Sequence, residues 1–253
     1  MTADAAPALP QTCYPSVWLW PGQALYAGPS LNLAPHSGSV WCLAVGIDGP
    51  LTVATADGAT RRAHSVLIPP RLTHQLTCHG TGLVSCYLEP TSDRADASRH
   101  KFSEWDGDVG VGHVDETRLQ FTPADDESAS HWLDLAAPAA HRTIDARIAA
   151  AAQRIRDDPT ATISSQQLAA EAALSESRFL HLFRDELGTS LRRYRLWVRL
   201  THAGTAIAAG DNLTTAAVKS GFASPSHLAD RFKATFGLSA SQLLGGGLTL
   251  RIS

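Results

Sequence analysis

Short apolar runs occupy the chain between Ser16 and Glu89. They are VWLW at 17–20, VWCLAV at 40–45, LTVAT at 51–55, SVLIPP at 65–70 and LVSCYL at 83–88, and Gly, Pro, Asp and Asn lie between them. Runs of this length, rich in Val, Leu and aromatic residues and interrupted this often, are typical of antiparallel strands. We therefore predict an antiparallel β-barrel or sandwich in this part of the chain.

The segment from Thr91 to Asp134 is polar and has no clear apolar period. We assign it to loops, with one strand near Val109–Val114 and a short helix near Ser128. Residues 1–12 are predicted to form a loose tail.

The apolar spacing becomes helical after residue 142. Ile144, Ile148 and Ile155 share one helical face, and we expect Thr143 to cap this helix and Pro159 to follow its end. LAAPAAH at 135–141 has the composition of a linker. We therefore divide the chain into a first domain of residues 1–135, a linker of residues 136–142 and a helical domain of residues 143–253.

One pattern occurs twice in the helical domain. ALSESRFLHLFRDELG at 173–188 and GFASPSHLADRFKATFG at 221–237 align on Phe183 and Phe232. Each copy reads as a short helix, a tight turn and a longer helix capped by serine, which is the plan of a helix-turn-helix. The predicted units span residues 164–188 and 213–237. A helix over 190–209 lies between them and is long enough, at about 1.5 Å per residue, to set their separation.

The longer helix of each unit has an apolar face and a face of short polar and basic residues. The second face is what a reader of the DNA major groove needs, although a merely solvated face has the same composition. Duplication favours DNA, because successive major grooves recur about 34 Å apart along a duplex. The predicted DNA contacts are Ser177, Arg178, His181, Arg184, Arg192, Arg195, Ser226, His227, Arg231 and Lys233.

The charge of the chain is divided unequally. Residues 1–140 hold 7 Lys or Arg and 15 Asp or Glu, a balance of -8, whereas residues 141–253 hold 14 and 9, a balance of +5. A basic domain carrying paired helix-turn-helix units is expected to meet a polyanion. The sequence has no long apolar run and no signal-peptide pattern at its start, so we expect a cytoplasmic protein with no membrane partner.

The residues from LAAEAALSESRFLHLFRDELG through LSASQLL resemble the tandem helix-turn-helix domain of AraC/XylS-type transcription regulators over about 143–245. The resemblance implies an α+β two-domain fold, with an N-terminal antiparallel cupin-like β-barrel or sandwich ahead of an all-α DNA-binding domain. It also implies a small-molecule effector bound by the N-terminal domain, homodimers, contact with RNA polymerase and activation of transcription. Asp230 stands where the family usually has arginine, His181 occupies the matching slot of the first unit, and Ala240 and Leu243 replace the usual proline and tyrosine.

The N-terminal domain contains residues from which a sensor pocket can be built. His36 and His74 fall near cupin ligand positions, but the second histidine and the glutamate of the usual motif are absent. We therefore predict no metal and no cofactor. The candidate effector-pocket residues are His36, Trp41, His64, His74, Cys78 and Cys86.

Three alternatives stay open. One is a cupin-type metal-dependent enzyme, which would need three convergent ligands. Another is a regulator that senses metal or thiol chemistry through the N-terminal His and Cys residues, although buried cysteines are more often core residues. A third is an interaction module, which would bind duplex DNA with little dependence on salt, whereas a DNA reader shows a steep inverse dependence. A methyl-accepting repair domain is disfavoured because the paired-cysteine spacing for zinc is missing.

Overall fold

The computed structural model describes residues 15–31, 33–139, 143–245 and 247–252; the expected tail at residues 1–12 and part of the linker lie outside them. Eight strands form a large sheet in the order β11-β1-β2-β8-β3-β6-β10-β9, and three form a small sheet in the order β5-β4-β7. Every neighbouring pair is antiparallel except β1 and β11. The strands of the large sheet are β1 (Ser16–Trp20), β2 (Gln23–Pro29), β3 (Trp41–Gly46), β6 (Ser65–Ile68), β8 (Gly82–Leu88), β9 (Phe102–Asp106), β10 (Val109–His113) and β11 (Thr249–Ile252). Those of the small sheet are β4 (Leu51–Thr55), β5 (Thr60–Ala63) and β7 (His74–Cys78).

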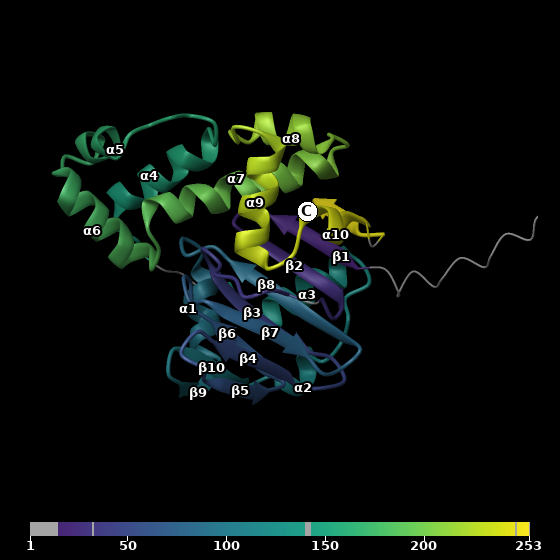
Figure 1. Ribbon diagram of the computed structural model, residues 1–253. Helices are drawn as coiled ribbons and strands as arrows, with labels where there is room; N and C mark the ends of the chain where they lie inside the picture. Colours follow the sequence, from purple (N-terminus) through teal and green to yellow (C-terminus); the bar gives the residue numbers. More distant parts are fainter. Residues whose placement is uncertain (1–14, 32, 140–142, 246, 253) are drawn as a thin grey trace, which may run out of the picture.

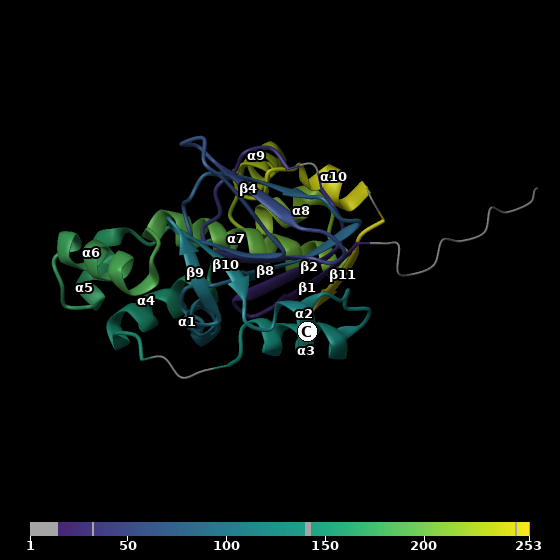
Figure 2. The same ribbon diagram turned by 90° about the horizontal axis from the view of Figure 1, so that it is seen from below.

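The predicted strands and antiparallel fold are confirmed, with two sheets that do not close into a barrel. Because side chains alternate across a strand, the central strands β2, β3, β6 and β8 of the large sheet supply two cores. Trp18, Leu25 and Cys86 pack on one face with Trp132 from α3 (Asp126–Ala136). The opposite face packs against the small sheet, and Figure 2 shows α2 (Glu116–Leu119) and α3 on the other side of the large sheet from β4.

The segment from Thr91 to Asp134 is more regular than predicted. The expected strand near Val109 is β10, and the expected short helix near Ser128 is α3, whose start is fixed by a capping box between Asp125 and Ser128. The structure adds α1 (Asp93–His100), β9 and α2, where the sequence predicts loops. In α1 only Ala95 and Ser98 are buried, so the helix leaves no apolar period in the sequence.

The helical domain consists of α4 (Ala146–Asp157), α5 (Ser165–Glu171), α6 (Glu176–Leu187), α7 (Leu191–Ala208), α8 (Leu213–Lys219), α9 (Pro225–Phe236) and α10 (Ala240–Gly245). The prediction that Thr143 caps the first helix is wrong, because Asp145 is the N-cap and accepts a hydrogen bond from the backbone of Arg147. The predicted face of α4 is confirmed, with Ile148 and Ile155 buried. Within the described residues, no helix is long and apolar enough to cross a bilayer.

The two parts of the chain share cores and a sheet. Leu19 and Ala24 of the large sheet pack in one cluster with Tyr194 and Trp197 of α7. Strand β11, which follows the helical domain, pairs with β1, so the C-terminal segment is not all helical as predicted. Figure 1 shows α7 lying across the top of the strands, with α4, α5 and α6 at one end of it and α8 and α9 at the other.

Candidate DNA-reading surface and interdomain pocket

The two longer helices of the repeat begin and end alike. Ser175 caps α6 by accepting a hydrogen bond from the backbone of Arg178, and Ser224 caps α9 by accepting one from His227. Each helix ends at a glycine in the left-handed conformation, with φ of 61° at Gly188 and 77° at Gly237. Glycine is favoured there because it lacks a Cβ atom. The serine and glycine of each copy thus set the same helix length twice.

The apolar faces of both helices pack toward α7. Phe179 and Phe183 of α6 are fully buried, and the ring of Phe183 lies 5.6 Å from that of Tyr194. Leu228 of α9 is buried in a cluster with Leu200 and Ala203 of α7. At about 1.5 Å per residue, the 18 residues of α7 span roughly 27 Å. One rigid helix therefore holds the two units apart (Figure 1).

Eight of the ten predicted DNA contacts have exposed side chains. They are Ser177, Arg178, His181, Arg184, Arg192, Ser226, Arg231 and Lys233. His227 is half-buried, and its Nε2 accepts a hydrogen bond from Arg231 Nε at 3.3 Å. Arg231 therefore lies against His227 and remains exposed on the outer face of α9. His181 lies 3.5 Å from Asp185 on the outer face of α6.

Arg195 differs from the other predicted contacts. Its half-buried guanidinium donates a hydrogen bond to the carbonyl of Ile163, just before α5. Two further arginines of α7 make similar contacts, Arg193 with Ser37 and Gly38, and Arg199 with Pro159. Arg192 is the one arginine of α7 that is exposed. The arginines of this helix therefore brace the chain around it as well as adding positive charge.

The N-terminal domain docks on α9 at the end of the helix. The backbone of Ala34 donates to the carbonyl of Gly237 at 2.8 Å, and that of Ser37 donates to Ala234 at 3.4 Å. The rings of Tyr87 and Phe236 meet edge to face at 5.3 Å. These contacts hold the C-terminal end of α9 against the N-terminal domain.

An apolar pocket lies between the two domains, with a free volume of about 130 Å³. Val17, Leu83 and Tyr87 line it from one face of the large sheet, and Leu76 and Cys78 from β7. Helices α7 and α9 contribute Trp197, Leu200, Gly204, Leu228, Phe232 and Phe236, and the segment after α9 contributes Leu243, Leu244, Leu248 and Leu250. The pocket thus contacts the face of α9 opposite to the predicted DNA contacts.

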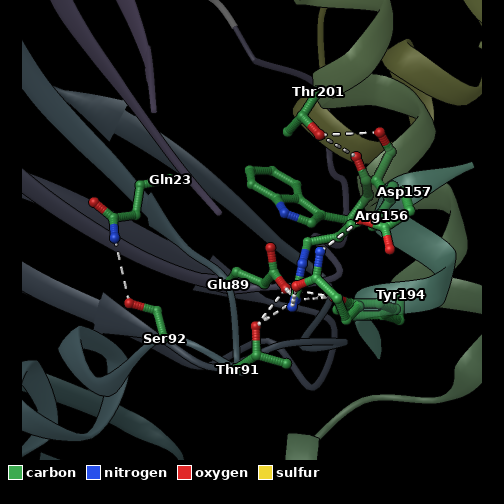
Figure 3. A network of polar contacts seen from close by, with 11 residues as sticks. Gln23, Glu89, Thr91, Ser92, Arg156, Asp157, Tyr194 and Thr201 are labelled. Atoms are coloured by element: carbon green, nitrogen blue, oxygen red, sulfur yellow. Dashed lines mark hydrogen bonds and ion pairs between the residues drawn. The ribbon is translucent and has the colours of Figure 1, made fainter. Parts of the chain in front are cut away.

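A buried polar cluster also joins the two domains. Glu89, at the end of β8, is 2% exposed and accepts hydrogen bonds from Tyr194 of α7 at 2.5 Å and from Arg156 of α4 at 2.8 Å. The hydroxyl of Thr91 donates to the same carboxylate oxygen (Figure 3). Burial, and then the adjacent Glu89 carboxylate, raises the pKa of Tyr194, so its hydroxyl keeps its proton and remains a donor.

The predicted pocket residues do not form one site. Cys78 lines the interdomain pocket, whereas Trp41 lies with Arg71, Arg99 and Trp105 at an open groove elsewhere on the first domain. Cys86 is buried in the core beneath Trp132, and burial raises the pKa of its thiol.

The imidazoles of His36 and His74 pack together with ring centroids 4.4 Å apart, and both are buried. Burial, and then the neighbouring His36, lowers the pKa of His74 to about 4, so both rings are neutral at pH 7. His64 lies apart and contacts Gln120 at 3.2 Å. Within the described ranges, no three His, Cys, Asp or Glu side chains are grouped so as to hold a metal ion.

These features define the architecture of the protein. Two helix-turn-helix units are held by one helix, α7, and a β-rich domain packs against them around an apolar pocket. A helix-turn-helix domain family model matches residues 168–245. No curated protein matches the chain by sequence. The predicted resemblance to AraC/XylS-type regulators is confirmed by this match together with the two-domain fold of the solved structures below.

Structures of ToxT from Vibrio cholerae share this fold along nearly the whole chain. An apo ToxT variant from strain SCE256 has a TM-score of 0.59 at 13% identity, over 89% of this chain and 98% of that one. ToxT with a bound unsaturated fatty acid has a TM-score of 0.54 at 13% identity, over 90% and 96%. ToxT from strain O395 bound to (E)-4-(8-methylnaphthalen-1-yl)but-3-enoic acid has a TM-score of 0.55 at 14% identity, over 88% and 97%. At these identities the likeness shows a common fold.

Proposed function

We propose that the protein is a sequence-specific DNA-binding transcription regulator whose binding to double-stranded DNA is controlled by a small molecule held between its domains. The observation that carries the proposal is the pair of α6 and α9, each capped in the same way, each with an exposed polar face, and both fixed to α7. Such an arrangement suits two successive major grooves on one side of a duplex.

The interdomain pocket supports control by a ligand. Leu228, Phe232 and Phe236 of α9 line it, so a ligand there would contact the buried face of the helix whose outer face is assigned to DNA. A ligand shifts the equilibrium between two arrangements only if it binds one of them better. A pocket with walls from both domains meets this requirement, because any relative movement of the domains changes its shape. The ToxT structures with bound carboxylic acids support a small, largely apolar effector by analogy.

The remaining parts of the proposal rest on the family resemblance. We expect a cytoplasmic homodimer that activates transcription through contact with RNA polymerase. The same resemblance gives no enzymatic role to either domain. In this proposal the N-terminal domain spans residues 1–135, and the helical domain that follows the linker carries the DNA contacts.

Selection of bound sequences from a random duplex library, at two salt concentrations, tests the DNA-binding part. We expect an enriched motif of two blocks about one helical turn, roughly 10 base pairs, apart, and weaker binding at higher salt. Retention without any enriched motif and without salt dependence would contradict the proposal and favour an interaction module.

The side chains are tested on the selected site. Arg178→Ala and His227→Ala should weaken binding to this site by about 1–3 kcal/mol each and weaken binding to random duplex much less. Arg147→Ala is the matched control, because Arg147 is an exposed arginine that belongs to α4 rather than to either reading helix, and its side chain pairs with Asp145. Equal losses on both duplexes would leave these residues with phosphate contacts alone.

A further inference from the structure

The interdomain pocket has no charged side chain among its described lining residues, and this restricts the chemistry of its ligand. The walls are almost entirely aliphatic and aromatic. Leu19, Leu83 and Leu200 are typical members, and each is buried. The absence of a cation matters because two of the ToxT structures described above hold carboxylic acids.

The polar groups at the pocket are few. Several already have partners, but the buried Nε1 of Trp197 has none within the described residues. The hydroxyl of Tyr26 donates to the carbonyl of Pro29 at 2.7 Å, and that of Thr201 donates to backbone carbonyls of its own helix. The thiol of Cys78 contacts the carbonyl of Gly82 at 3.4 Å. Ser85 is 3% exposed and lines the pocket from β8, and no hydrogen bond to its hydroxyl occurs within the described residues.

The local environment penalises charge. Burial raises the pKa values of Tyr26, Tyr87 and Cys78, each of which would become an anion on losing a proton. A ligand carboxylate in the same space would lose its hydration without gaining a cation in return, which is strongly unfavourable.

The size of the pocket sets a second limit. A cavity of roughly 150 Å³ lined by Leu, Ile and Phe is known to bind benzene. The free volume here, about 130 Å³, is close to that. A compact ligand therefore fits without movement, whereas a long chain would require Leu243, Leu248 and their neighbours to move outward.

We infer that the interdomain pocket takes a compact, uncharged and largely hydrocarbon molecule, with one hydroxyl or carbonyl group that bonds to Ser85. The inference rests on the proposed role of this pocket as the effector site, and it sets the ligand class apart from the carboxylic acids bound to ToxT.

Benzyl alcohol and benzoate are the matched probes, because they share a ring and differ in charge at pH 7.5. Ligand-detected NMR titration of the full chain should show benzyl alcohol binding at least about tenfold tighter than benzoate. Ser85→Ala should weaken binding of benzyl alcohol by about threefold to tenfold. Gly204→Leu, which fills the pocket from α7, should abolish it, whereas Ala206→Leu, on the same helix but outside the lining, should not.

Adding a positive charge gives a test in which binding is expected to increase, so a misfolded variant cannot produce the expected result. Leu248 lines the pocket and is half-buried, so Leu248→Arg can place a cation at its rim and should raise affinity for benzoate at least about tenfold. Ile252→Arg adds the same charge to an exposed position of β11 outside the lining and should leave benzoate binding unchanged.

Three results would overturn the inference: benzoate binding as tightly as benzyl alcohol, binding of benzyl alcohol that survives Gly204→Leu, or no binding of benzyl alcohol at all. None of these results changes the outcome expected when bound DNA sequences are selected from the random duplex library. An error in the proposed ligand class can therefore be distinguished from an error in the DNA-binding proposal.

Discussion

Replacing Arg156 by alanine removes the cation from the buried cluster that joins the two domains. The Arg156 side chain is 30% exposed, whereas its partner Glu89 is 2% exposed. After the substitution the carboxylate stays buried and keeps the hydroxyl donors of Tyr194 and Thr91. We therefore expect a large but incomplete loss of the stabilisation that the cluster provides.

The magnitude follows from what is lost and what remains. Breaking a buried ion pair by removing one partner costs about 3–5 kcal/mol. The cost is smaller here, because Arg156 is partly exposed and Glu89 keeps two hydroxyl donors. We therefore expect the free energy of unfolding to fall by about 2–3 kcal/mol. For a chain of this size the melting temperature should fall by about 5–10 °C.

Arg154→Ala is the matched control on the same helix. Arg154 pairs with Glu171 at 3.1 Å, but the two side chains are 54% and 46% exposed, and such surface pairs contribute about 0–1 kcal/mol. Calorimetry and urea unfolding, read by far-ultraviolet circular dichroism, give the two values. If Arg156→Ala is no more destabilising than Arg154→Ala, the reasoning about this cluster is refuted.

Three other predictions concern single positions. The pKa of His74 is about 4 in the folded chain and near 6.5 in the unfolded chain. Neutral His74 therefore contributes fully to stability above about pH 6.5, and up to about 3 kcal/mol is lost as the pH falls toward 4. His74→Gln should flatten this part of the stability profile measured by urea unfolding. Asp230→Arg should raise affinity for random duplex and steepen its salt dependence in binding titrations, because the exposed carboxylate repels phosphate; an unchanged slope would contradict this. Gly237→Ala should destabilise the fold by more than Gly188→Ala in thermal melts. Both glycines have positive φ, but an added Cβ would lie 2.6 Å from Ala34 O at Gly237 and would have no neighbour within 4 Å at Gly188. Equal losses would mean that α9 is not held by the loop around Ala34.

The features that the sequence predicted best are those with a local cause. Serine caps, the proline at the start of α9 and the glycines at the ends of α6 and α9 act within a few residues, so the two helix-turn-helix units could be located from sequence alone. Short apolar runs separated by Gly, Pro, Asp and Asn likewise predicted the antiparallel fold.

The missed features depend on distant partners. Strand β11 is a run of four residues whose partner β1 lies at the other end of the described chain, and nothing in TLRI indicates that pairing. The interdomain pocket is assembled from β1, β2, β7, β8, β11 and helices α7 to α10, and only Cys78 among the predicted pocket residues belongs to it. Histidine and cysteine are the chemically distinctive types on which the prediction depends, whereas the pocket is lined mainly by leucine and aromatic residues.

The pairing of β11 with β1 connects the two domains a second time. The chain passes from the first domain to the second after α3 and returns to the large sheet after α10. Any movement of the helical domain relative to the first domain must therefore either carry β11 and the large sheet with it or break the pairing of β11 with β1.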